Sequence, residues 1–233
     1  MKDIFFCPEE SKFYSHCLER MVFSHCCNSE SVIEFGSGDG SPVIDSLLKT
    51  RFNGLVHGFE LNTSAWKVAN STIEEYDLCD RYVIYNESFF DSSSSTSDTE
   101  YLISNPPYLP APNDDIYMPQ LWGGTDGSTL TKQLLSLGYD NALLLISSFS
   151  DPAGTINYAI KQGYNISDFV VVPLPFGYYS SEPKVKRHIQ ELRNNNMAFY
   201  SDKFYFLAGV LFKKQHESTK DLSGELVQVM TAL

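Results

Sequence analysis

Four consecutive residues, Asn105-Pro106-Pro107-Tyr108, bring together a carboxamide, two rigid imino acids and an aromatic ring. They follow the apolar run 101–104, which reads as a buried strand of a parallel sheet. Proline lacks a backbone N–H and cannot extend a sheet, so the strand must end there. Ligands of open α/β sheets bind beyond the carboxyl ends of the strands. The segment is therefore a candidate site for a planar group, with an ordinary strand-ending turn as the alternative.

A second chemical signal lies nearer the start of the chain, at Gly36-Ser37-Gly38-Asp39-Gly40. These glycines follow the apolar run 31–35 and precede a helical pattern, so they let the backbone approach a ligand where a strand turns into a helix. The GxGxG spacing differs from the GxGxxG of dinucleotide binders. Glu60 closes the next apolar run, where an acidic side chain commonly binds ribose hydroxyls. Together these features indicate an adenosine-containing ligand.

The charge of the glycine turn narrows the choice of ligand. A pyrophosphate favours helix N-terminal N–H groups without negative charge nearby. This turn contains Asp39 and is entered through Glu34, which suit a cationic ammonium or sulfonium better. S-adenosylmethionine fits that requirement, although either carboxylate alone could be a helix-cap or surface residue.

The elements that must position these residues alternate along the chain. Helical patterns separate seven apolar runs that read as strands: 31–35, 55–59, 82–85, 101–104, 142–146, 169–172 and 205–212. Such alternation predicts an α/β fold with a seven-stranded, mostly parallel, doubly wound sheet in a single domain.

The flanking segments predict a simple domain organisation. Residues 1–30 hold one lead-in helix, 31–213 form the main domain with an insertion at 173–203, and 214–233 form a tail. The insertion contains a helical pattern through Val185, Ile189 and Leu192. We expect the apolar stripe of the tail to pack on its own domain, and the serine-rich segment 92–98 to be a surface loop.

Charge and cysteine content exclude some functions. Lys plus Arg number 17 and Asp plus Glu 29, a net charge of −12, which disfavours binding to phosphate backbones. The densest basic segment, 184–188 with Arg193, reads as a solvated helix face rather than a phosphate clamp. The five cysteines form no CxxC pair, and the adjacent Cys26 and Cys27 point to different faces of any regular element, so we expect no metal site.

Targeting signals are also absent from the sequence pattern. It shows neither a long apolar stretch nor a signal peptide. With the odd number of cysteines, this predicts a soluble protein of the reducing cytoplasm that has no membrane partner.

The order of glycine turn, strand-end acid and Asn105-Pro106-Pro107-Tyr108 resembles that of Rossmann-like S-adenosylmethionine-dependent methyltransferases. The NPPY motif is typical of members that methylate a planar amino nitrogen. The following stretch 121–127 is similar to that of HemK-type protein glutamine methyltransferases. The resemblance covers roughly residues 31–150 and implies that the last strand of the sheet is antiparallel.

The resemblance also implies which residues act. The NPPY residues Asn105, Pro106, Pro107 and Tyr108 would be catalytic. The residues implied for S-adenosylmethionine, whose product is S-adenosylhomocysteine, are Glu34, Phe35, Gly36, Ser37, Gly38, Gly40, Glu60, Leu61, Ser88, Phe89 and Asn105. The acid that usually meets the adenine amino group is replaced by Ser88 or shifted to Glu87.

The sequence departs from the family at its start. Thirty residues before the first strand cannot hold the helical substrate-docking domain of the bacterial enzymes. Pro8-Glu9-Glu10 is instead similar to the lead-in of compact eukaryotic and archaeal HemK-like enzymes, which often work with a small activating subunit.

Three functions remain open from the sequence. A protein substrate, methylated on a glutamine side chain such as that of a release factor, fits the acidic charge best. Methylation of an adenine amino group in DNA or RNA is the alternative, since NPPY does not separate the two. A non-catalytic cofactor-binding partner subunit is the third.

Overall fold

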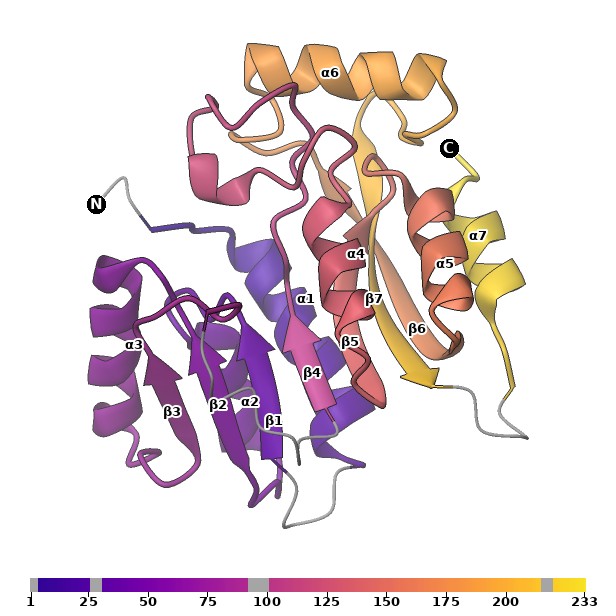
Figure 1. Ribbon diagram of the computed structural model, residues 1–233. Coiled ribbons are helices and arrows are strands. Elements are labelled where there is room, and N and C mark those ends of the chain that lie inside the picture. The colour runs from indigo at the N-terminus through magenta and orange to yellow at the C-terminus, as the bar shows by residue number, and fades with distance from the viewer. Residues whose placement is uncertain (1–3, 26–30, 92–100, 215–219) are drawn as a thin grey trace. The chain divides into compact units, whose positions relative to one another are not determined.

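The computed structural model in Figure 1 describes residues 4–25, 31–91, 101–214 and 220–233. The expected loop 92–98 and the pair Cys26 and Cys27 lie outside the described residues. The chain forms two compact units, residues 1–105 and 106–233. The boundary between these units falls inside the NPPY motif, directly after Asn105.

The seven strands follow the order β3-β2-β1-β4-β5-β7-β6. Four belong to the first unit and are parallel to their neighbours within it: β1 (Ser31–Phe35), β2 (Leu55–Phe59), β3 (Tyr82–Tyr85) and β4 (Tyr101–Ser104). Their bounds are those that the apolar runs predict. Three belong to the second unit: β5 (Asn141–Ser147), β6 (Tyr164–Pro175) and β7 (Phe204–Lys214). β7 is antiparallel to both β5 and β6, which confirms the expected antiparallel last strand.

In the first unit, helices α1 (Pro8–Leu18) and α2 (Ser41–Lys49) pack against each other, and Figure 1 shows both behind the strands. Pro8 begins α1, where its missing N–H costs no hydrogen bond. A π-helical turn, Glu19–Phe23, extends it. Helix α3 (Thr63–Glu75) contacts β3, and the Asn62 side chain caps it by accepting from the Ser64 and Ala65 N–H groups.

In the second unit, the helices are η2 (Pro119–Leu121), α4 (Thr129–Ser136), α5 (Pro152–Lys161), α6 (Pro183–Asn194) and α7 (Ser223–Met230). The helix predicted within the insertion is α6, whose Val185, Ile189 and Leu192 are buried. The predicted tail helix is α7, which buries Leu226 and Met230 and contacts α5 and β6. The tail therefore packs on its own unit, as expected.

The start of β6 differs from the prediction. The strand begins at Tyr164 rather than Phe169, and its end at Pro175 takes the first residues of the expected insertion. Polar residues at 165, 167 and 168 hide this part of the strand in the sequence. They are tolerated because β6 is the edge strand and carries a β-bulge between Ile166 and Asp168.

The seven-stranded α/β fold is thus the one predicted. Among the described residues, no helix combines the length and the apolar character needed to cross a membrane.

Candidate functional site

The carboxyl ends of β1, β2, β3 and β4 meet at one edge of the first unit. Phe35 at the end of β1 pairs in register with Phe59 of β2, which pairs with Tyr85 of β3. The hydroxyl of Ser104, the last residue of β4, donates to the Phe35 carbonyl at 2.8 Å. The residues that follow these strands, including Gly36, Glu60 and Asn105, therefore emerge from the same edge.

The glycine turn leaves open space above two of its residues. Gly36 and Gly38 have φ values of +72° and +58°, which favour glycine, and a Cβ built on either meets no heavy atom within 4 Å. Gly40 is different, because its Cβ would lie 3.2 Å from the Ala69 Cβ of α3. Gly40 thus serves helix packing, whereas Gly36 and Gly38 face space that a ligand can use.

Four backbone N–H groups of this turn are already engaged. Those of Gly36 and Ser37 donate to the Phe59 carbonyl, that of Gly38 to the Glu60 carboxylate and that of Gly40 to the Ser37 carbonyl. A phosphate needs such groups free to receive it. These four groups are therefore not free to receive a pyrophosphate, in agreement with the charge argument from the sequence.

Glu60 ties the turn to the end of β2. One carboxylate oxygen accepts from the Gly38 N–H at 2.7 Å and the other from the Asn62 N–H at 2.6 Å. The Asn86 side chain donates to the Glu60 carbonyl at 2.8 Å and so fixes the backbone there. A carboxylate has about four acceptor sites, so Glu60 retains capacity for hydroxyl donors such as those of a ribose.

Glu34 lies beneath the turn rather than on it. Its side chain is only 1% exposed, and its carboxylate accepts from the Tyr82 hydroxyl and, at 3.4 Å, from the Tyr14 hydroxyl. Burial raises the pKa of the Glu34 carboxyl to about 7, while the hydrogen bond from Tyr82 opposes that rise. Glu34 is thus a buried carboxyl group next to the turn, held by two phenols. Ser37, 4% exposed, sits over Gly58, where a Cβ would come within 2.3 Å of its hydroxyl.

Aromatic side chains line the same strand ends. Phe89 makes edge contacts with Phe35 at 5.5 Å and with Phe59 at 5.3 Å between ring centroids. Phe90, 39% exposed, and Leu61, 72% exposed, are apolar side chains left to solvent here. Ser88 is partly buried and Glu87 is exposed. The residues expected to receive adenine therefore share one edge with the glycine turn.

Asn105 presents an unpaired acceptor at this edge. Its side-chain nitrogen donates to a carboxylate oxygen of Glu10 at 3.5 Å. Its side-chain oxygen is buried and has no hydrogen-bond partner among the described residues. Burying an amide oxygen without a donor costs about 1–3 kcal/mol, so such an atom in a native structure calls for a donor.

The second unit holds the rest of the NPPY motif. Tyr108 is 8% exposed and packs against Phe149 with ring centroids 5.8 Å apart. The Ser150 hydroxyl donates to the Tyr108 carbonyl at 2.7 Å. A Cβ on Gly123 would lie 2.6 Å from the Tyr108 Cα and 2.7 Å from the Pro107 carbonyl oxygen. The glycine-rich stretch 123–127 therefore lies directly against the motif backbone.

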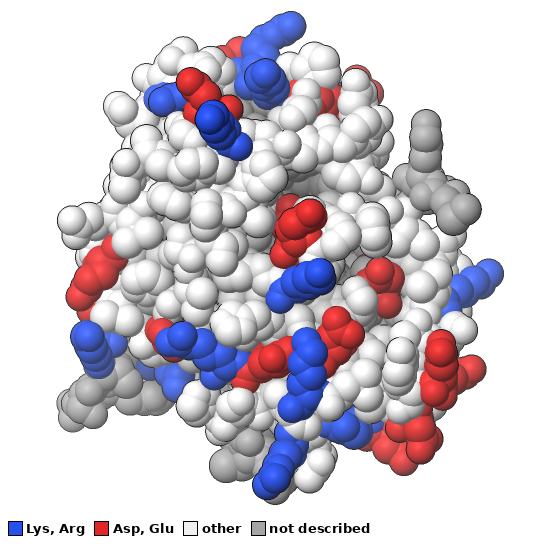
Figure 2. Space-filling view, turned by 180° about the vertical axis from the view of Figure 1, so that it is seen from behind, with Lys and Arg blue, Asp and Glu red and all other residues white. Residues whose placement is uncertain are grey.

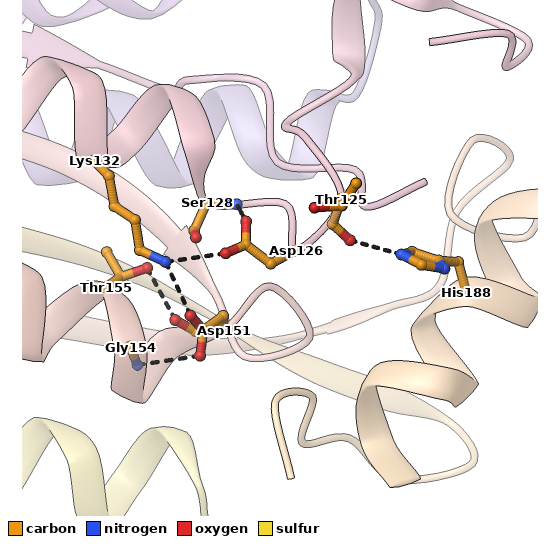
Figure 3. A network of polar contacts seen from close by, with 8 residues as sticks. All are labelled: Thr125, Asp126, Ser128, Lys132, Asp151, Gly154, Thr155 and His188. Carbon is orange, nitrogen blue, oxygen red and sulfur yellow. Dashed lines mark hydrogen bonds and ion pairs between the residues drawn. The ribbon is translucent and has the colours of Figure 1, made fainter. Parts of the chain in front are cut away.

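A polar network fixes that stretch (Figure 3). The Lys132 ammonium lies 3.0 Å from carboxylate oxygens of both Asp126 and Asp151. Asp151 is the N-cap residue of α5, and its side chain accepts from the Gly154 N–H. His188 of α6 contacts the Thr125 carbonyl at 2.6 Å. Burial raises the pKa of Asp126, but hydrogen bonds from Ser128 and Lys132 outweigh it and lower the pKa. The network joins α4, α5 and α6 to the stretch beside the motif.

Metal ligands and basic side chains were sought in the part of the chain that the structure describes. Within residues 4–25, 31–91, 101–214 and 220–233, no three His, Cys, Asp or Glu side chains gather as metal ligands would. On the face shown in Figure 2, Lys and Arg side chains are interspersed with Asp and Glu. In the basic segment of α6, Lys184 contacts Asn113 and Asp115, and Arg193 lies over the Tyr200 ring.

Three functional candidates escaped the sequence patterns. Glu10 lies 95 residues from Asn105, and Tyr14 and Tyr82 lie 20 and 48 residues from Glu34. No local spacing links such residues. The only available signal for Glu10 was the similarity of Pro8-Glu9-Glu10 to the HemK-like lead-in.

Comparison of the sequence with known proteins gives a partial match. No family model matches the chain. It is 30% identical over 113 residues to a release factor glutamine methyltransferase of Thermosynechococcus vestitus. The match covers 44% of this chain and spans 38% of that relative's length.

Comparison of structures shows the fold. M. jannaschii TYW2 in complex with AdoMet superposes with a TM-score of 0.53 at 15% identity, over 91% of this chain and 79% of that one. M. capricolum TrmK in complex with S-adenosylhomocysteine gives 0.51 at 9% identity, over 95% and 75%. The [4+2]-cyclase SpnF gives 0.55 at 10% identity, over 88% and 80%. The fold is therefore that of Rossmann-like methyltransferases, and it also carries other chemistry.

Proposed function

We propose that this protein is an S-adenosylmethionine-dependent N-methyltransferase that acts on a planar amide or amino nitrogen. The observation that carries the proposal is the buried side-chain oxygen of Asn105, which has no hydrogen-bond partner in the described part of the chain and lies at the edge where the glycine turn opens. Fold alone does not decide activity, since a cyclase shares it. The proposal therefore rests on the site.

The residues of the first unit fit the cofactor. Open space over Gly36 and Gly38 leaves room for its methionine part, and Glu60 retains acceptor sites for ribose hydroxyls. Phe35, Phe59 and Phe89 supply aromatic surface for the adenine. S-adenosylmethionine would supply an electrophilic methyl group whose leaving group is a neutral thioether.

The chain's task is then to prepare the accepting nitrogen. An amide nitrogen is a poor nucleophile because its lone pair is delocalised into the carbonyl group. The Asn105 side-chain oxygen and the Pro106 carbonyl would accept its two N–H bonds, favouring a pyramidal nitrogen whose lone pair is free to form the new N–C bond. The proton that this nitrogen then sheds passes to water. Tyr108 would pack against the planar group, so that catalysis depends on positioning and electrostatics.

A protein glutamine is the favoured acceptor. The net charge of −12 disfavours a phosphate backbone. The matched relative from Thermosynechococcus vestitus is named for methylating a release factor glutamine, which supports the same choice. A release factor is therefore the first substrate to test.

Methyl-labelled S-adenosylmethionine and a cell extract provide that test. The label should enter protein, resist nuclease, be removed by protease and map to a glutamine side chain by mass spectrometry. Label that nuclease releases would instead identify an adenine methyltransferase. Absence of any transfer, despite bound cofactor, would identify a non-catalytic subunit.

A substitution at the carboxamide tests the assigned role. Asn105→Ala should abolish methyl transfer, because it removes the side-chain oxygen that accepts a hydrogen bond from the substrate nitrogen. Calorimetry should still show binding of S-adenosylhomocysteine within a few-fold of wild type. Asn195→Ala, at an exposed asparagine after α6, is the control and should leave both unchanged. Loss of cofactor binding in Asn105→Ala would show that Asn105 has a structural role instead.

A further inference from the structure

Glu10 is a buried carboxylate in the first turn of α1. It is 8% exposed, whereas its neighbour Glu9 is exposed, although both lie where the helix dipole favours an acid. The dipole is served equally well by an exposed side chain. Burying a carboxylate costs free energy unless partners hold it, so the burial of Glu10 needs a reason of its own.

Asn105 is a hydrogen-bond partner of that carboxylate. The Asn105 side-chain nitrogen lies 3.5 Å from a Glu10 oxygen, a long contact of the kind that tightens when a ligand binds. Cys7 also interacts with Glu10, and burial together with the Glu10 charge raises the pKa of its thiol to about 12. The thiol therefore stays protonated and adds no second negative charge.

A carboxylate decides which way a carboxamide faces. It has only acceptors, so it selects the NH₂ end of Asn105 and turns the oxygen the other way. That oxygen is the buried atom without a partner among the described residues. Without Glu10, rotation by half a turn would exchange the two ends and present N–H groups to the N–H groups of an acceptor.

We propose that Glu10 is a positioning residue that holds the Asn105 carboxamide with its oxygen toward the methyl acceptor. This inference rests on the proposed function. Glu10 acts through Asn105 and does not touch the reacting atoms. Its contribution therefore falls on kcat, since a misplaced catalytic group typically costs about 100-fold in rate.

Paired variants test this role. Glu10→Ala should lower kcat by about 100-fold and leave the dissociation constant of S-adenosylhomocysteine unchanged. Glu10→Gln keeps the volume and one acceptor oxygen and should lose less. Glu9→Gln removes the neighbouring charge from the same helix turn and should match wild type.

A second experiment exchanges the hydrogen-bond donor and acceptor between positions 10 and 105. Asn105→Asp places two carboxylates together and should be nearly inactive, because like charges repel and Glu10 can no longer orient the side chain. Adding Glu10→Gln restores a hydrogen bond between the two side chains. Its direction is reversed, because the side chain at position 10 now donates and that at position 105 accepts. The double variant should therefore transfer methyl groups faster than Asn105→Asp alone.

The outcomes separate the two proposals. A wild-type protein that transfers methyl to no substrate overturns both. An active wild type whose rate is unchanged in Glu10→Ala, or weaker binding of S-adenosylhomocysteine at an unchanged kcat, overturns the positioning role alone. Failure of Glu10→Gln to raise the rate of Asn105→Asp also overturns it, even if Glu10→Ala proves too unstable to study.

Discussion

At the scale of single residues, the site combines one buried acid with one open turn. Glu34 lies beneath the glycine turn, held by Tyr14 and Tyr82, while the space above Gly36 and Gly38 is open. The acid affects stability and the turn affects ligand binding. A substitution of Glu34 therefore tests stability, and a substitution in the glycine turn tests ligand binding.

Glu34 should make stability depend on pH. The pKa of its carboxyl rises from 4.5 to about 7 on burial, so the folded state binds the proton more tightly than the unfolded state. The resulting stability is fully present below about pH 4.5 and is lost as pH rises through 7. The loss is of the order of 3 kcal/mol at most.

Glu34→Gln removes this titration. When pH is raised from 5 to 8, wild type should lose more free energy of unfolding than the variant does, with both measured by urea denaturation. The same difference between variant and wild type at both pH values would show that Glu34 titrates normally in the folded protein.

Gly38 should be needed for the cofactor as well as for the backbone. Gly38→Ala places a methyl group at a φ of +58°, which costs about 1–2 kcal/mol, and puts it into the open space assigned to the ligand. Calorimetry should show loss of binding to S-adenosylhomocysteine.

Gly138 provides a matched control. It also has a positive φ, +83°, and nothing within 4 Å of its Cβ, but it lies after α4 in the second unit. Gly138→Ala should be destabilised to a similar extent and bind S-adenosylhomocysteine normally. Equal binding of S-adenosylhomocysteine by the two variants would show that the glycine turn is not part of the cofactor site.

At the scale of elements, the stretch 123–127 supports the NPPY backbone. It contacts Tyr108 directly and is held by the Lys132 network and by His188 of α6 (Figure 3). Gly123 and Gly127 are explained by this close approach, because a Cβ at either position would come too near backbone atoms of Tyr108.

Gly123→Ala should therefore displace the motif. Its Cβ would come within 2.6 Å of backbone atoms of Tyr108 and Gly127, so the backbone has to move. We expect a lower midpoint of thermal unfolding and a large loss of methyl transfer. Gly177→Ala, whose Cβ meets nothing within 4 Å, should change neither. Full activity in Gly123→Ala would show that the stretch does not position the motif.

The bounds of a strand can be predicted from the sequence where the strand coincides with a continuous run of apolar residues. β1 to β4 begin and end where their apolar runs do, because a glycine or a polar residue flanks each run on both sides. The first part of β6 was missed because an edge strand tolerates polar residues. The partners of Glu34 and Asn105 were missed for a different reason, since they come from distant elements and only the tertiary fold brings them together.

At the scale of the whole molecule, the net charge is the feature that bears on the proposed substrate. With 29 acidic residues against 17 basic ones, the protein repels polyanions at long range. On the face in Figure 2, Lys and Arg side chains lie among Asp and Glu side chains. This arrangement favours a protein substrate over DNA or RNA.

A mobility-shift assay checks this inference. At low ionic strength, where electrostatic binding is strongest, we expect no shift of a single-stranded DNA or RNA probe. A shift that salt abolishes would reveal a phosphate-binding surface and favour the adenine alternative.

The central claim is that the methyl donor binds at the glycine turn beside Asn105. Its most direct test is a crystal structure with S-adenosylhomocysteine. The account predicts ribose hydroxyls on Glu60, the amino acid part over Gly36 and Gly38, and the sulfur nearest Asn105. Binding at any other place, or an Asn105 carboxamide turned away from the sulfur, would contradict it.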